Sequence, residues 1–171
     1  AAPYQGHLDT IIDEIEYQFG ASDLLGACIA RNASGAPKIK RKPYFEVTFT
    51  NGAKVFFRPG GTIGASFRSL HVDLLLVDEA AWLPESAWKA VRQCLNAGGT
   101  MRVYSTPNGL RDTTYYRITD DPDYQHFKWP SWVAPDWSPD REKELLSFYG
   151  GRDTPGWQHE VAGEHGQPTW A

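Results

Sequence analysis

The sequence predicts an α/β fold, with a mainly parallel sheet flanked by helices and an added β-hairpin. Strand and helix signals alternate along the chain, and the apolar run 74–77 is continuous, as in parallel strands that are covered on both faces. Asn51-Gly52 separates two segments of alternating apolar and polar residues, which indicates a hairpin. The 171 residues, 41% hydrophobic and 22% charged, have the size and composition of a single globular domain.

The first third of the chain combines a helix with the hairpin. Apolar residues recur at helical spacing from Leu8, and acidic residues lie between them, so we expect an amphipathic helix that runs to Gly20. Residues 1–3, just before this helix, fit the end of a strand. Residues 30–42 contain Gly, Pro, Asn and Ser together with five basic residues, which predicts an exposed loop. The hairpin follows, with a two-residue turn at Asn51-Gly52.

The later elements continue the alternation. A flexible glycine-rich connection at 60–66 leads to a strand at 73–78, and then to a helix that Pro84 opens, that carries Leu95 inward and that Gly98-Gly99 closes. The remaining expected elements are strands at 101–104 and 124–132, a helix from Ser138 to Gly150, and a short helix near 156–163.

Composition excludes several classes of protein. No apolar run approaches the roughly 18 residues of a membrane span, so we expect a cytoplasmic protein. Cys28 and Cys94 form no CxxC pair, which leaves two reduced, packed thiols as the expectation. The net charge of −4 does not favour a surface that wraps DNA. The basic residues of 30–42 form either a solvated face or a contact for a nucleic-acid backbone.

Carboxylates and hydroxyls fall at two neighbouring strand ends. Asp78 and Glu79 follow the apolar strand, and Ser105 and Thr106 follow the next one. In parallel sheets the chemistry lies at the carboxyl ends of the strands. An enzyme that hydrolyses nucleoside triphosphates needs one carboxylate for magnesium and a second to orient the attacking water. An acidic start to the following helix would also explain the two acids, but the pairing with the hydroxyls favours the catalytic interpretation.

These strand-end segments resemble a known family. LLLVDEAAWLP at 74–84 followed by VYSTPNG at 103–109 is similar to the large terminase subunit of tailed bacteriophages, the ATPase that pumps DNA into an empty capsid. The resemblance implies a P-loop NTPase core of the RecA-like (ASCE) type. Within it, Asp78 matches the Walker B aspartate that holds the metal, and Glu79 matches the catalytic glutamate.

The same resemblance assigns further residues. Arg68, ten residues ahead of Asp78, is the expected catalytic arginine that reaches a neighbouring subunit's nucleotide, with Arg58 as the second candidate. For either arginine the alternative is an ordinary surface or salt-bridged side chain. The residues expected to contact the nucleotide are Gln5, which lies in the similar opening segment, and Ser105, Thr106 and Pro107, which match the family's coupling motif.

The family also implies cofactors and partners. ATP and Mg²⁺ are the expected cofactors, and the enzyme is expected to be an ATPase. Its expected partners are double-stranded DNA, the portal protein, the small terminase subunit and further copies of itself in a ring, with no membrane. The expected place of action is the host cytoplasm, transiently at the procapsid portal.

One part of the family pattern is missing. Residues 59–66 are rich in glycine, but no lysine follows the last glycine, so the sequence contains no Walker A loop to hold the phosphates. We therefore expect residues 1–171 to be a single partial ATPase domain, with the Walker A segment upstream, a nuclease domain downstream, and little activity by itself. The alternatives are a helicase-like nucleic-acid translocase and a non-catalytic fragment or assembly module.

Other possible sites are weaker. His159 and Glu160 imitate the start of a zinc-protease helix, but Gly163 stands where the second histidine is required. The acidic residues around Pro122 are typical of a solvated turn. Seven tryptophans, five of them from Trp129 onward, are expected to serve core packing and subunit contacts rather than base stacking.

Overall fold

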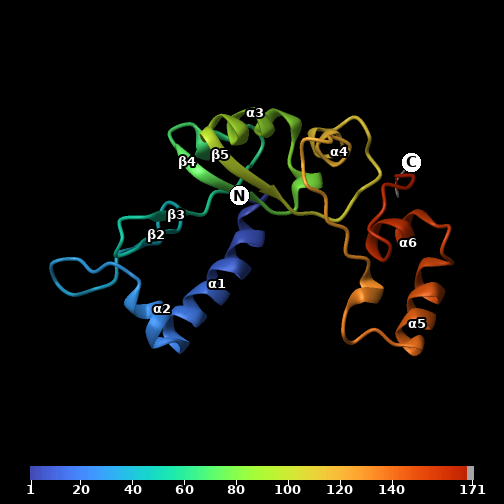
Figure 1. The fold of residues 1–171 in the computed structure, drawn as a ribbon, viewed down its shortest axis with the longest axis horizontal. Coiled ribbons are helices and arrows are strands. Elements are labelled where there is room, and N and C mark those ends of the chain that lie inside the picture. Colours follow the sequence, from blue (N-terminus) through green and yellow to red (C-terminus); the bar gives the residue numbers. More distant parts are fainter. Residues whose placement is uncertain (169–171) are drawn as a thin grey trace.

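The computed structural model describes residues 1–168 and has an α/β fold with small sheets (Figure 1). A helix and a hairpin lie at one end, a parallel pair of strands lies in the middle, and two helices lie at the other end. The helices are α1 (Gln5–Ala21), α2 (Asp23–Ala27), α3 (Glu85–Gln93), α4 (Thr114–Thr119), α5 (Pro139–Tyr149) and α6 (Pro155–Glu160). The strands are β1 (Ile39–Lys40), β2 (Glu46–Thr48), β3 (Lys54–Phe56), β4 (Val72–Val77) and β5 (Leu95–Val103). Within residues 1–168, no helix combines the length and apolar character that crossing a membrane requires.

The first unit packs α1 against an antiparallel sheet of order β1-β2-β3. The expected helix is confirmed, and it begins slightly earlier than Leu8 because the turn starting at Gln5 is already helical. The hairpin is confirmed too, but its connection has three residues, since Phe49 N–H donates to the carbonyl of Ala53. Gly52 occupies the left-handed position that such a three-residue loop requires.

The central unit contains the parallel pair β4 and β5, with α3 packed on it. Helix α3 ends at Gln93, so the prediction that Gly98-Gly99 closes this helix is wrong. Both glycines lie instead in an irregular part of β5, between the pairs Val72↔Leu95 and Leu74↔Thr100. A Cβ at Gly99 would lie 3.0 Å from the carbonyl oxygens of Asp73 and Asn96, so any larger residue would require these neighbours to shift.

The chain start lies beside β4, near the middle of Figure 1. The Ala1 amino group donates to the carbonyl of Leu76 (2.7 Å), and Asp78 N–H donates to the carbonyl of Ala1 (2.8 Å). Ala2 forms a parallel bridge with Pro59. The backbone order is therefore Pro59, Ala2, β4, β5, which fits the expectation that residues 1–3 end a strand.

One face of this parallel pair remains open. Leu75 and Val77 are buried, but Leu74 and Leu76 are 51% and 46% exposed. The prediction of a sheet covered on both faces is therefore wrong for the described residues. A continuous apolar run does not by itself report which of the two faces of a strand is covered.

Gly60 and Gly64 in the glycine-rich stretch 60–66 are buried, whereas residues 61–63 between them are exposed. A side chain at Gly60 would come within 2.2 Å of Leu83, and one at Gly64 within 2.7 Å of Ala90 on α3. The Ser66 hydroxyl donates to the carbonyl of Pro59 (2.7 Å). A three-residue 3-10 turn, Ala65–Phe67, ends this stretch.

In the last third of the chain, one predicted helix is confirmed and one predicted strand is wrong. Helix α5 has the expected boundaries, since the Ser138 hydroxyl caps its start and Gly150 ends it in the left-handed conformation. The expected strand at 124–132 is wrong, because this segment is irregular and has no strand partner among the described residues. Cys94 is buried as expected, whereas Cys28 is exposed.

Candidate functional site

The ends of β4 and β5 lie side by side and are joined by backbone hydrogen bonds. Tyr104 N–H donates to the carbonyl of Val77 (2.8 Å), and Ala80 N–H donates to the carbonyl of Tyr104 (3.1 Å). Asp78 and Glu79, at the end of β4, are therefore adjacent to the chain that leaves β5. This is the arrangement that the sequence predicts for these two strand ends.

Glu79 holds an unusual backbone conformation. Its φ is 50° and its ψ is 42°, and among the described residues it is the one non-glycine residue with a positive φ. A non-glycine residue in the left-handed region is strained, and such strain persists only where neighbouring contacts hold it. The strain marks the position that the sequence assigns to the catalytic glutamate.

Two side chains from the segment after β5 hold this turn. The Ser105 hydroxyl accepts a hydrogen bond from Ala81 N–H (3.0 Å), and the Asn108 amide donates to the carbonyl of Ala81 (2.8 Å). Asn108 is only 2% exposed, and its side-chain oxygen also accepts from Leu110 N–H (3.1 Å). The sequence predicts Ser105 in this region, but it predicts no role for Asn108. Its place directly after Pro107 was the available signal.

Tyr115 joins α4 to the same region. Its hydroxyl donates to the carbonyl of Ser105 (3.2 Å). Burial raises the pKa of Tyr115 to about 12, and the negative charge of Glu79 adds to this rise. The tyrosine therefore keeps its proton at neutral pH and remains a donor beside the acidic turn. Sequence reasoning missed it, because nothing predicted α4.

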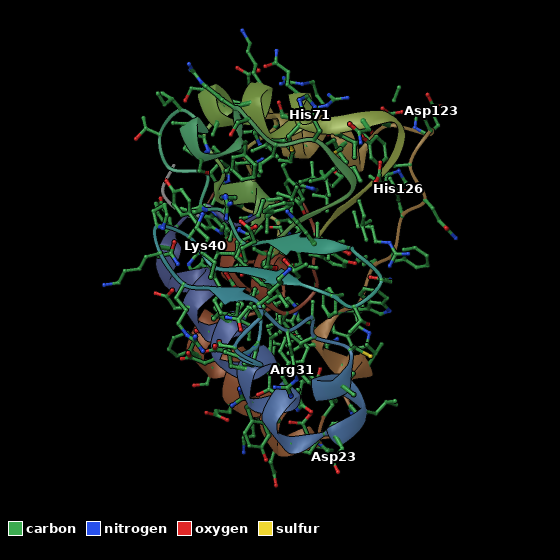
Figure 2. The ribbon with its side chains drawn as sticks, turned by 90° about the vertical axis from the view of Figure 1, so that its left-hand side faces the viewer. Asp23, Arg31, Lys40, His71, Asp123 and His126 are labelled. Carbon is green, nitrogen blue, oxygen red and sulfur yellow. The ribbon has the colours of Figure 1, made fainter. Side chains whose placement is uncertain are left out.

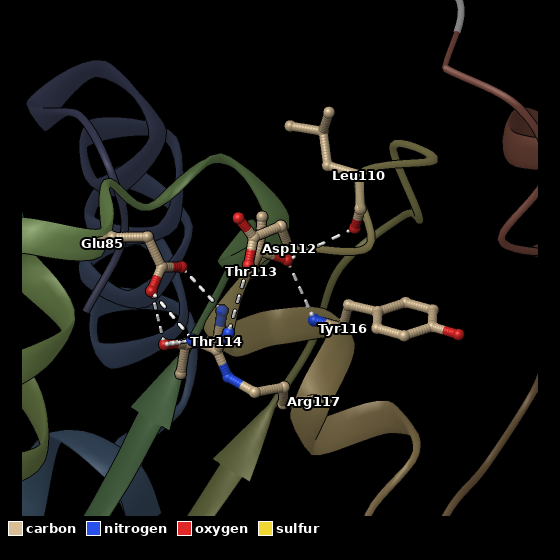
Figure 3. A network of polar contacts seen from close by, with 7 residues as sticks. All are labelled: Glu85, Leu110, Asp112, Thr113, Thr114, Tyr116 and Arg117. Carbon is tan, nitrogen blue, oxygen red and sulfur yellow. Dashed lines mark hydrogen bonds and ion pairs between the residues drawn. The ribbon is translucent and has the colours of Figure 1, made fainter.

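A polar network fixes α4 in place (Figure 3). Glu85, the first residue of α3, accepts hydrogen bonds from both the N–H and the hydroxyl of Thr114, each 2.7 Å long. Arg117 forms an ion pair with the same carboxylate (3.2 Å). The Thr113 hydroxyl caps α4 by accepting from Tyr116 N–H (3.1 Å). Glu85 thus joins the starts of two helices, which accounts for an acid at this position without any catalytic role.

The acidic pair is compatible with magnesium. Asp78 and Glu79 are both half-buried, and the described residues contain no group of three or more His, Cys, Asp or Glu side chains that could enclose a metal ion. Magnesium typically keeps several waters and takes only one or two protein carboxylates together with substrate phosphates. The donor set at the end of β4 therefore fits a nucleotide-bound Mg²⁺ and does not fit a closed protein cage.

The two candidate arginines have different environments. Arg58 is buried, forms an ion pair with Glu46 (3.5 Å), donates to the carbonyls of Phe45 (3.3 Å) and Phe57 (3.0 Å), and lies over the Tyr44 ring. These contacts make it a structural arginine. Arg68 is exposed after the 3-10 turn and has no ion pair within residues 1–168. Of these two arginines, Arg68 is the one with an exposed side chain and no ion pair among the described residues.

The remaining assigned residues lie at varied depths. Gln5 is exposed at the start of α1, where its side chain donates to Asp9 (2.7 Å). Thr106 is half-buried and Pro107 is buried, both directly after Ser105. The structure therefore brings Ser105 to the acidic turn, while Gln5 has a local partner instead.

The structure does not favour a functional site at His159, at the turn around Pro122 or at the tryptophans. His159 on α6 is buried, and burial lowers its pKa. Asp121 accepts a hydrogen bond from Asp123 N–H (3.0 Å), as expected for a turn. Of the tryptophans, Trp88 and Trp157 are buried, while Trp129 is 71% exposed and Trp170 lies outside the described residues.

Comparisons with known proteins do not extend the assignment: neither a family model nor a curated protein sequence matches this chain. The residues at the two strand ends, and the resemblance of their sequence, are therefore the basis for proposing a function.

Proposed function

We propose that this chain is part of the ATP-hydrolysing motor of a phage DNA-packaging terminase, with a P-loop NTPase core. The observation that carries the proposal is the strained turn at Glu79, held from the end of β5 by the Ser105 hydroxyl. Backbone strain of this kind clusters at catalytic sites. The strand-end sequences that resemble terminases are the same segments that contain this turn.

Asp78 and Glu79 have separate roles in this proposal. Asp78 would hold Mg²⁺, and Glu79 would polarise the attacking water. When bound, the magnesium ion neutralises charge on the transferred phosphoryl group. Ser105 couples the site to α4, because its hydroxyl binds the acidic turn while its carbonyl accepts from Tyr115. A shift of the turn is thereby passed to α4.

The proposal has further parts outside these two strand ends. The β and γ phosphates require a phosphate loop, which the described residues do not contain. Arg68 assists hydrolysis on the neighbouring subunit of a ring. The proposed partners are double-stranded DNA, the portal protein and the small terminase subunit, at the procapsid portal in the host cytoplasm.

A pair of variants tests the two roles separately. In the full protein, Asp78→Asn is expected to weaken Mg²⁺-dependent nucleotide binding, whereas Glu79→Gln is expected to keep that binding and lose hydrolysis. Glu14→Gln, an exposed position on α1, is the matched control. Binding is measured with a fluorescent nucleotide in Mg²⁺ and again in EDTA. Equal nucleotide affinity in both buffers, for the parent protein, would contradict the proposed metal role of Asp78.

A further inference from the structure

Helix α1 covers one face of the β1–β3 sheet at the central strand β2, while Val55 on the same face of the edge strand β3 is 42% exposed; we call the opposite face the open face. Val47 is directly opposite Ile39 on β1 and Val55 on β3, so these three side chains point to the same side of the sheet. Val47 is buried there in one cluster with Leu8 and Ile12 of α1. Residues that alternate with these three point away from α1, toward the open face.

Lysines occupy the open face in two rows. Thr48 N–H donates to the carbonyl of Lys38, and Thr48 is opposite Lys54, so Lys38, Thr48 and Lys54 form one row across the three strands. In the next row Lys40 is opposite Glu46, and Glu46 is opposite Phe56. Lys38, Lys40 and Lys54 are all exposed, and we call them the lysine face. Figure 2 views this end of the molecule, with Lys40 labelled.

Strand geometry sets the spacing of the three charges. The Cα atoms of Lys38 and Lys40 are about 7 Å apart along the strand direction. Those of Lys38 and Lys54 are about 10 Å apart, because two strand spacings separate them. A rigid sheet therefore presents three ammonium groups within a small area.

The lysine face keeps its positive charge. Glu46, the carboxylate in these rows, is turned to the buried Arg58 (3.5 Å), and no ion pair joins the three lysines to a carboxylate in the described part of the chain. No Asp or Glu occurs between Asp23 and Glu46, whereas that interval contains five Lys and Arg residues. A chain with a net charge of −4 thus has a local positive surface here.

We propose that the lysine face binds the phosphate backbone of double-stranded DNA. Unpaired lysines on a sheet are point charges suited to phosphates, and the Thr48 hydroxyl between two of them is a further donor. The nearby rings of Tyr44 and Phe56 are half-buried and lie against Arg58, so they are not free to stack with the bases of a single strand. The choice of DNA as the polyanion depends on the proposed motor function.

The test is the salt dependence of duplex binding by the purified protein. A labelled 20-base-pair duplex is titrated by fluorescence anisotropy between 50 and 200 mM salt, with the triple variant Lys38→Gln, Lys40→Gln, Lys54→Gln. Each phosphate contact contributes about −0.9 to the slope of log K against log salt, so the slope should become shallower by about 2.7. Between 50 and 200 mM salt, duplex affinity of the triple variant should therefore fall by about 40-fold less than that of the parent.

A second triple variant controls for net charge. Lys89→Gln, Arg92→Gln and Lys143→Gln remove three exposed positive charges from α3 and α5 and should leave the slope unchanged. Equal slopes for both triple variants, no duplex binding by the parent, or equal displacement of the duplex by polyglutamate would each overturn the proposal. The titration is run without nucleotide, so its outcome does not depend on the hydrolysis assay.

Discussion

Asn108 should be a main determinant of stability at the end of β4. It is 2% exposed, its amide donates to the carbonyl of Ala81 (2.8 Å), and its oxygen accepts from Leu110 N–H (3.1 Å). Asn108→Ala removes both side-chain hydrogen bonds, so the Ala81 carbonyl and the Leu110 N–H each lose their Asn108 partner. Each such group costs about 1–3 kcal/mol when it is fully buried, and because Leu110 is only half-buried we expect the free energy of unfolding to fall by about 2–4 kcal/mol.

Urea unfolding, followed by tryptophan fluorescence, measures this loss. With an m-value of about 2 kcal/mol/M, the urea midpoint should fall by about 1–2 M. Asn96→Ala is the matched control, because Asn96 makes a single exposed hydrogen bond to Asp73 (2.8 Å) and its loss should cost less than about 1 kcal/mol. If the two variants unfold at the same urea concentration, Asn108 does not hold the turn and the account of the strained Glu79 fails.

Three further predictions concern other residues. Arg58→Ala should lower the free energy of unfolding by about 2–4 kcal/mol, because it leaves the partly buried Glu46 carboxylate without its ion-pair partner. Arg68→Ala should change that free energy by less than about 0.5 kcal/mol, because Arg68 is exposed. Similar losses in the two variants would refute the structural role of Arg58. Gly64→Ala should cost about 1–3 kcal/mol more than Gly61→Ala, since both have positive φ but only Gly64 faces α3; equal urea midpoints would contradict this close approach. Burial lowers the pKa of His159 from its ordinary 6.5, so stability should be full above pH 6.5 and decline as the pH falls below it; a His159→Gln variant with an equally large decline between pH 7.5 and 5.5 would exclude this cause.

Local signals in the sequence predicted the elements whose ends depend on local chemistry. Helix α5 was predicted with its boundaries, because the Ser138 cap and Gly150 act within one turn of each end. The hairpin was predicted for the same reason, although three residues rather than two connect its strands. Both features are decided by neighbours in the sequence.

Features that depend on distant partners were not predictable in the same way. Residues 124–132 alternate like a strand but have none to pair with among the described residues, and an unpaired strand leaves its backbone groups unsatisfied. Gly98 and Gly99 resemble a helix end, yet they belong to β5, where Gly99 lies against Asp73. Here tertiary contacts override the local signal.

In the candidate site too, some features were predictable from the sequence and others depend on distant contacts. The placement of Asp78 and Glu79 beside Ser105 follows from the order of parallel strands, and the sequence predicted it. The left-handed backbone of Glu79 and the supporting roles of Asn108 and Tyr115 come from contacts across more than 20 residues of sequence, which no local pattern reports.

The steady-state rate of ATP hydrolysis by the full protein with Glu79→Gln tests the central claim most directly. A carboxylate that positions the attacking water contributes about 100-fold or more, so kcat should fall by at least about 100-fold while nucleotide affinity stays within about threefold of the parent. Glu14→Gln should keep the parental rate. Parental turnover in Glu79→Gln would contradict the assignment of this strand end as the hydrolytic site.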